Sequence, residues 1–119
     1  MIVKNEYAAL DLISTFLMAA KEDPRINSAH ISLYASLVYL WQKHDFENPV
    51  SFFRRDLVPF CKISGTATFH RSIKELNEFG YVRYIPSYNP YMGSLIYLIK
   101  SERTWYNVKG ALENKSSNK

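Results

Sequence analysis

Residues 56–82 read DLVPFCKISGTATFHRSIKELNEFGYV, and this stretch decides the fold. At about 100° per residue, Phe69, Ile73 and Leu76 fall on one side of a helix that runs to about Phe79. Gly80 then supplies the residue type that most often ends a helix in a left-handed conformation. The stretch therefore predicts an amphipathic helix with a defined end.

A shorter helix is predicted just before it, over residues 54–61, with Leu57, Val58 and Phe60 facing inward. Pro59 lacks an amide hydrogen, so it has to lie near an end of this helix or distort it. The residues KISG at 62–65 form a tight turn. Either Ser64 or Thr66 can accept a hydrogen bond from a free amide at the start of the next helix.

The sequence on either side of this unit predicts a compact domain. Helices are expected over residues 5–22 and 28–44, with Asn27 or Ser28 as the cap of the second. Two strands are predicted from the alternation of their side chains, at residues 81–85 and 94–99. A turn-rich loop at residues 86–93 connects them, so the three segments form a hairpin at residues 81–99. Residues 50–52 fit either a very short strand or the start of a helix.

The stretch at residues 56–82 resembles the helix-turn-helix of bacterial winged-helix regulators, including the GntR-type and MarR-type. The resemblance lies in a small apolar helix, an I-S turn, and the motifs T-x-x-R, I-K-E-L and G-Y-V. The turn is one residue longer than in the GntR-type pattern. The chain also resembles small winged-helix proteins of bacterial mobile elements. The resemblance implies a mainly α fold with a small β-hairpin, a winged helix-turn-helix, and a role in DNA binding and transcription regulation.

The outward face of the helix after the turn carries the expected DNA contacts. Arg71 can pair with guanine O6 and N7, Ala67 can touch a thymine methyl group, and Lys74 can contact a phosphate. A charged outer face is also what any solvated surface helix shows, and Glu75 and Glu78 share part of this one. The full candidate set is Arg54, Arg55, Lys62, Ser64, Thr66, Ala67, Thr68, His70, Arg71 and Lys74.

The loop of the hairpin, residues 86–93, is called the wing loop below. No Lys or Arg occurs between Tyr84 and Ile99, whereas a wing that enters a minor groove usually brings a cation. We therefore expect this loop to pack on the domain or to contact a partner rather than to read bases. Its candidate contact residues are Tyr88, Asn89, Tyr91 and Met92.

Composition excludes several other classes of protein. Hydrophobic residues make up 47% and charged residues 22% of 119 residues, and the net charge is +4, which permits a nucleic-acid partner without requiring one. Cys61 is the single cysteine, so it is expected to be a small core residue, and no disulfide can form within the chain. No signal peptide, membrane span, metal-ligand spacing, cofactor motif or catalytic motif is found, so the expected location is the cytoplasm.

One domain is expected over residues 1–112, including a C-terminal segment at 100–112, followed by a flexible tail at 113–119. The apolar face of the first helix is wider than a core requires, so a homodimer contact there is considered. Sequence-specific binding of double-stranded DNA by a transcriptional regulator is the first expectation. A replication-initiation or excision accessory factor, and a winged helix that binds protein, remain the alternatives.

Overall fold

The computed structural model describes residues 2–98 of the chain, and side chains from residue 8 onward. Four helices and a small antiparallel sheet are seen in this part, so the expectation of a mainly helical fold with a β-hairpin holds at that level. The predicted segment at 100–112 and the predicted tail at 113–119 lie outside the described residues. The elements are α1 (Ile2–Lys21), α2 (Ser28–Lys43), β1 (Val50–Phe52), α3 (Arg54–Cys61), α4 (Thr66–Glu78), β2 (Val82–Ile85) and β3 (Ser94–Leu98).

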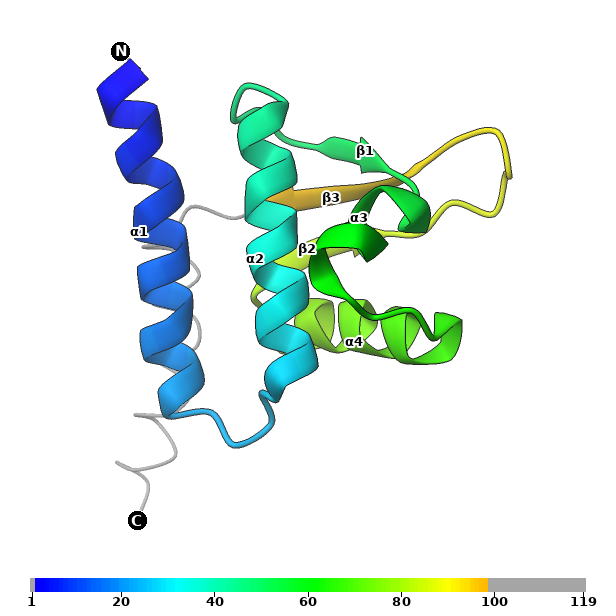
Figure 1. Cartoon of the computed structure of the whole chain (residues 1–119), viewed down its shortest axis with the longest axis horizontal. Coiled ribbons are helices and arrows are strands. Elements are labelled where there is room, and N and C mark those ends of the chain that lie inside the picture. Colours follow the sequence, from blue (N-terminus) through cyan, green and yellow to red (C-terminus); the bar gives the residue numbers. More distant parts are fainter. Residues whose placement is uncertain (1, 99–119) are drawn as a thin grey trace.

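Helix α2 is the centre of the fold. It lies between α1 on one side and the sheet, α3 and α4 on the other (Figure 1). Its start is a reciprocal cap, in which the Asn27 side chain accepts from the amide of His30 at 3.2 Å and the Asn27 amide donates to His30 Nδ1 at 3.0 Å. Of the two predicted caps, Asn27 is therefore the one used, since its oxygen satisfies an amide that the helix leaves free.

The turn between α3 and α4 differs from expectation in its cap. Gly65, not Ser64 or Thr66, is the N-cap residue, and its carbonyl accepts from the amide of Phe69 at 2.9 Å, with no side-chain cap. At the other end of the turn, Lys62 takes the left-handed conformation with φ 63° and ends α3. Gly80 has φ 92° after α4, so the predicted helix end is confirmed.

The sheet contains one strand more than the predicted hairpin. Its order is β1-β3-β2, with β3 antiparallel to both neighbours. Residues 50–52 are thus a strand, in which Val50 and Phe52 are buried and Ser51 is exposed, as the period of two requires. The side chain of Asn48 continues this pairing by bonding the backbone of Leu98 in both directions, at 2.7 and 2.8 Å.

The core confirms the inward stripe of α4 and corrects that of α3. Phe69, Ile73 and Leu76 are buried, and Cys61 is also a core residue. The side chain of Phe60, predicted to face inward, is 54% exposed and lies instead beside the ring of Tyr39, with centroids 4.8 Å apart. The inward face of this short helix runs through Leu57 and Cys61, four residues apart, which places Phe60 on its flank.

None of the helices in the described part of the chain combines the length and apolar character needed to cross a membrane.

Candidate nucleic-acid interface

The exposed face of α4 lies opposite its buried stripe. Most of the predicted residues of this helix are on that face, with only Thr68 half-buried. Ser72 is buried on the inner side, where its small side chain suits the close packing of α4 against α2. The fold thus brings one predicted set to a single outward surface: Thr66, Ala67, His70, Arg71 and Lys74.

Arg71 and Lys74 form no ion pair with any side chain of the described residues. The sequence offers two pairs at a spacing of four residues, Arg71 with Glu75 and Lys74 with Glu78, which commonly form on helices. Among residues 8–98 neither pair forms: Glu75 bonds His30 instead, and neither cation lies within ion-pair distance of a described carboxylate. The guanidinium of Arg71 and the ammonium of Lys74 are therefore available to an anionic partner.

Glu75 bonds a buried group of α2 and pairs with neither Arg71 nor Lys74. The side chain of His30 is 1% exposed, and its Nε2 lies 2.8 Å from Glu75 Oε1. Since Nδ1 of the same ring accepts from the Asn27 amide, Nε2 of the neutral ring carries the hydrogen and donates to Glu75. This bond ties α2 to α4. Glu75 stays at the surface, where its side chain is 33% exposed and borders the same hollow as Arg71.

The basic residues around the turn, Arg54, Arg55 and Lys62, differ in their exposure and in the groups that they contact. Arg54 is half-buried, and its Nη1 donates to the carbonyl of Ser64 at 3.2 Å, so this side chain braces the turn. Arg55 is exposed and lies over the ring of Phe53, 4.4 Å from its centre. Lys62 and Ser64 are exposed beside them. These residues border the N-terminal end of α4 but do not lie on its outer face.

The wing loop projects from the sheet on the side away from α1 (Figure 1). Its side chains Tyr88, Tyr91 and Met92 are 92%, 90% and 64% exposed. The turn itself is ordered by Asn89, whose Oδ1 accepts from the amide of Tyr91 at 2.9 Å, as Asn commonly does in turns. The structure thus presents two tyrosines at the surface on a hydrogen-bonded turn.

Gly93 anchors the far end of this loop to β1. A Cβ at this position would lie 2.6 Å from Ser51 Oγ and 2.7 Å from the carbonyl oxygen of Phe52. Only a glycine allows this approach, so the place where the loop rejoins the sheet is closely defined.

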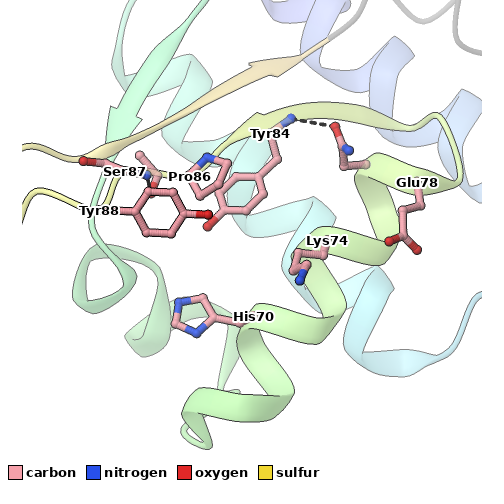
Figure 2. Close-up of a pocket in the computed structure, with 9 residues that line it drawn as sticks. His70, Lys74, Glu78, Tyr84, Pro86, Ser87 and Tyr88 are labelled. Carbon is pink, nitrogen blue, oxygen red and sulfur yellow. Dashed lines mark hydrogen bonds between the residues drawn. The ribbon is translucent and has the colours of Figure 1, made fainter.

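A cleft of about 480 Å³ separates α4 from the wing loop. Figure 2 shows His70 and Lys74 rising from the helix on one side, and Tyr84, Pro86 and Tyr88 on the other. A second hollow continues it toward α3 and is lined by Arg54, Asn89 and Met92, among others. The two hollows share four lining residues, namely His70, Tyr84, Ser87 and Ser94, so they form one groove.

Sequence reasoning missed a buried carboxylate, that of Asp23, whose hydrogen bonds position the end of α4. Buried Tyr81, directly after Gly80, donates to Asp23 Oδ2 at 2.7 Å, and the Arg25 guanidinium bonds both oxygens of the same carboxylate at 2.8 Å. The Arg25 bonds, with the Tyr81 hydroxyl, lower the pKa of Asp23 from its usual 3.8 to about 2, although burial opposes them. In the sequence Asp23 directly precedes Pro24, and no local signal there shows that its side chain is buried.

The described residues hold no group of three His, Cys, Asp or Glu side chains that could bind a metal ion. Cys61 is buried in the core, where its carbonyl accepts from the hydroxyl of Ser32. Comparison of the chain with protein-family models, with curated proteins and with solved structures found no match.

Proposed function

We propose that the protein binds double-stranded DNA in a sequence-specific manner through the outer face of α4, as a transcriptional regulator. The observation that carries the proposal is the pair Arg71 and Lys74, both exposed and both without an ion-pair partner in the described chain. A cationic helix face of this kind suits the phosphates and guanine edges of a major groove.

Each side chain of the face has a role in the proposal. Arg71 pairs with a guanine, and Lys74 holds a phosphate beside it. Thr66 and Ala67, in the first turn of α4, reach base edges or a thymine methyl group. The free amides of that first turn bind a phosphate oxygen, because an unpaired helix start carries partial positive charge. His70 contacts either a base edge or the backbone.

The order of elements supports a winged helix-turn-helix as the architecture. In the proposal α3 and α4 are the helix-turn-helix, α4 is the recognition helix, and β2 and β3 carry the wing loop. The sequence resemblance to bacterial winged-helix regulators covers the same residues. The proposed location is the cytoplasm. The protein is further proposed to form a homodimer through α1, whose side chains Leu10, Leu17 and Met18 are exposed.

The test is a salt series of binding to mixed-sequence duplex DNA. Wild-type protein is expected to bind at ~50 mM salt, with an affinity that falls steeply as salt rises, because bound phosphates release counterions. The variant carrying Arg71→Ala and Lys74→Ala is expected to bind more weakly, with the salt slope lowered by roughly 1 for each phosphate contact removed.

The matched control carries Lys21→Ala and Lys43→Ala, which remove the same charge from the C-terminal ends of α1 and α2. This control is expected to keep the wild-type slope. Absence of binding by wild-type protein at ~50 mM salt, or an equal loss in the two double variants, would contradict the proposal. Selection from a random DNA pool then identifies the preferred site.

A second candidate function is protein recognition by the wing loop. The observation in its favour is the exposure of Tyr88, Tyr91 and Met92 in a segment without Lys or Arg. Aromatic residues and Met are enriched in protein interfaces, whereas DNA contacts depend on cations. If this function holds, wild-type protein shows no salt-dependent binding to duplex DNA, and the salt series separates the two.

A further inference from the structure

The groove beside α4 has two chemically different walls. On the helix side His70 and Lys74 provide polar and cationic groups. On the sheet and loop side Tyr84 and Tyr88 provide rings, and no Lys or Arg occurs from residue 84 to residue 98. A duplex presents phosphates to both sides of a groove that embraces it, so the cation-free wall is poorly suited to a second row of phosphates.

The helix side of the groove carries one cation in each hollow, with His70 between them. Arg54 lines the hollow near α3, His70 lines both hollows, and Lys74 lines the hollow near the end of α4. Glu78 closes that last end with a negative charge. A phosphate chain therefore has a path of favourable groups from Arg54 to Lys74 on one side only.

The aromatic side has faces free for stacking. Tyr88 is 92% exposed although it lines the groove, so a flat ligand can cover its ring without displacing other side chains. Tyr84 is half-buried and held in place, because its amide donates to Asn77 Oδ1 at 2.8 Å (Figure 2). The cleft volume of about 480 Å³ is in the range of sites that hold small organic ligands.

A positively charged track beside exposed rings is how proteins hold single-stranded nucleic acid, since unpaired bases stack on aromatic side chains. Bases inside a duplex are already stacked on one another and cannot do so. We propose that this groove holds unpaired bases of a DNA strand, stacked on Tyr88, next to the duplex bound by α4. The inference rests on the proposed function and deepens it, because the preferred ligand becomes a duplex with an adjoining single strand.

The experiment compares two probes that share one duplex. One probe is blunt and the other carries a single-stranded overhang with 2-aminopurine among its bases; binding is followed by fluorescence anisotropy at fixed salt. We expect wild-type protein to bind the overhang probe at least about fivefold more tightly, as one stacked base provides. The 2-aminopurine emission is expected to fall on binding, because stacking quenches it.

Three variants locate the effect. Tyr88→Ala is expected to lower the preference for the overhang probe to about onefold, whereas Tyr88→Phe keeps the ring and keeps the preference. Tyr91→Ala is the matched control, because Tyr91 is 90% exposed in the same loop but lines neither hollow of the groove. It is expected to retain the preference. Since both tyrosines are exposed, circular dichroism of the variants is expected to match that of wild-type protein.

The outcomes separate this inference from the function on which it rests. Equal affinity of wild-type protein for both probes, with binding that depends on Arg71 and Lys74, overturns the groove inference and leaves the proposed function standing. Retention of the preference in Tyr88→Ala, or its loss in Tyr91→Ala, also overturns it. Absence of wild-type binding to the blunt probe at ~50 mM salt overturns the proposed function, and the inference with it.

Discussion

Helices α1 and α4 both bury one face in the same core, yet their exposed sides differ in the large side chains that they carry. On α1 the exposed side chains include Leu10, Leu17 and Met18. On α4 they include Arg71 and Lys74, neither of which forms an ion pair in the described residues. An apolar outer face favours contact with protein, whereas an unpaired cationic one favours a polyanion. The contrast indicates where each class of partner is to be sought.

The two helices also differ in what holds them. The inner face of α1 is apolar, with Ala9, Leu12 and Phe16 buried and the ring of Phe16 stacked on that of Tyr34 at 4.0 Å. The C-terminal half of α4 is held by the bond between Glu75 and His30.

The end of α4 has additional anchors. The guanidinium of Arg25 lies 4.2 Å from the centre of the Phe79 ring, and Tyr81 bonds Asp23 at 2.7 Å. Directional bonds at one end define the angle at which the N-terminal half, with His70 and Arg71, projects. A surface that reads a ligand requires such positioning.

The largest change in the free energy of unfolding is expected for a substitution on the buried face of α4, in contrast to one on its exposed face. Phe69→Ala removes a ring that is 1% exposed, so we expect the free energy of unfolding to fall by about 3–5 kcal/mol. His70→Ala, one residue later on the exposed side, is expected to change it by no more than about 0.5 kcal/mol. Urea denaturation measures both. A small effect of Phe69→Ala would show that α4 is not part of the core.

The stability of the folded protein in acid tests the hydrogen bonds of Asp23 with Arg25 and Tyr81. Its pKa is about 2 in the folded protein against 3.8, so the charged carboxylate stabilises the fold above about pH 4, and this contribution is lost as the pH falls toward 2. The loss amounts to about 2 kcal/mol. Denaturation of wild-type protein and of Asp23→Asn across this pH range should show a shallower decline in the variant. Parallel curves would exclude the hydrogen bonds of Asp23 as the cause of the acid destabilisation.

An effect of similar size is expected from the bond between α2 and α4. Glu75→Ala leaves the buried His30 Nε2 without an acceptor, which costs about 1–3 kcal/mol of unfolding free energy. Glu75→Gln retains an oxygen at the same place and should cost less. Thermal or urea denaturation compares the two. If both variants lose the same stability, the charge of Glu75 matters more than the hydrogen bond.

The smallest effect on stability is expected on α1. Leu10→Lys combined with Met18→Lys alters only exposed positions, so the unfolding free energy should change by no more than about 0.5 kcal/mol for each. Under the proposed homodimer, sedimentation at micromolar concentration shows a wild-type dimer and a monomeric variant. A wild-type protein that sediments only as a monomer removes the dimer from the proposal.

Local patterns in the sequence determined the part of this protein that runs from α3 to β3. The spacing of Phe69, Ile73 and Leu76 defines the buried side of α4, and hence the outward position of Arg71 and Lys74, because helical geometry alone relates them. The glycine after α4 and the alternation in β2 and β3 are equally local. These features needed no knowledge of what packs against them.

Only the tertiary structure decided which distant groups meet. His30 and Glu75 are 45 residues apart, and Asp23 and Tyr81 are 58 apart, so no periodicity within one element connects them. The same holds for β1, whose three residues are too few to identify a strand until Val50 is seen opposite Ile96. The groove, too, exists only because the wing loop returns beside α4. The sequence by itself therefore determined the faces of the helices, whereas the tertiary structure decided their partners and the space between them.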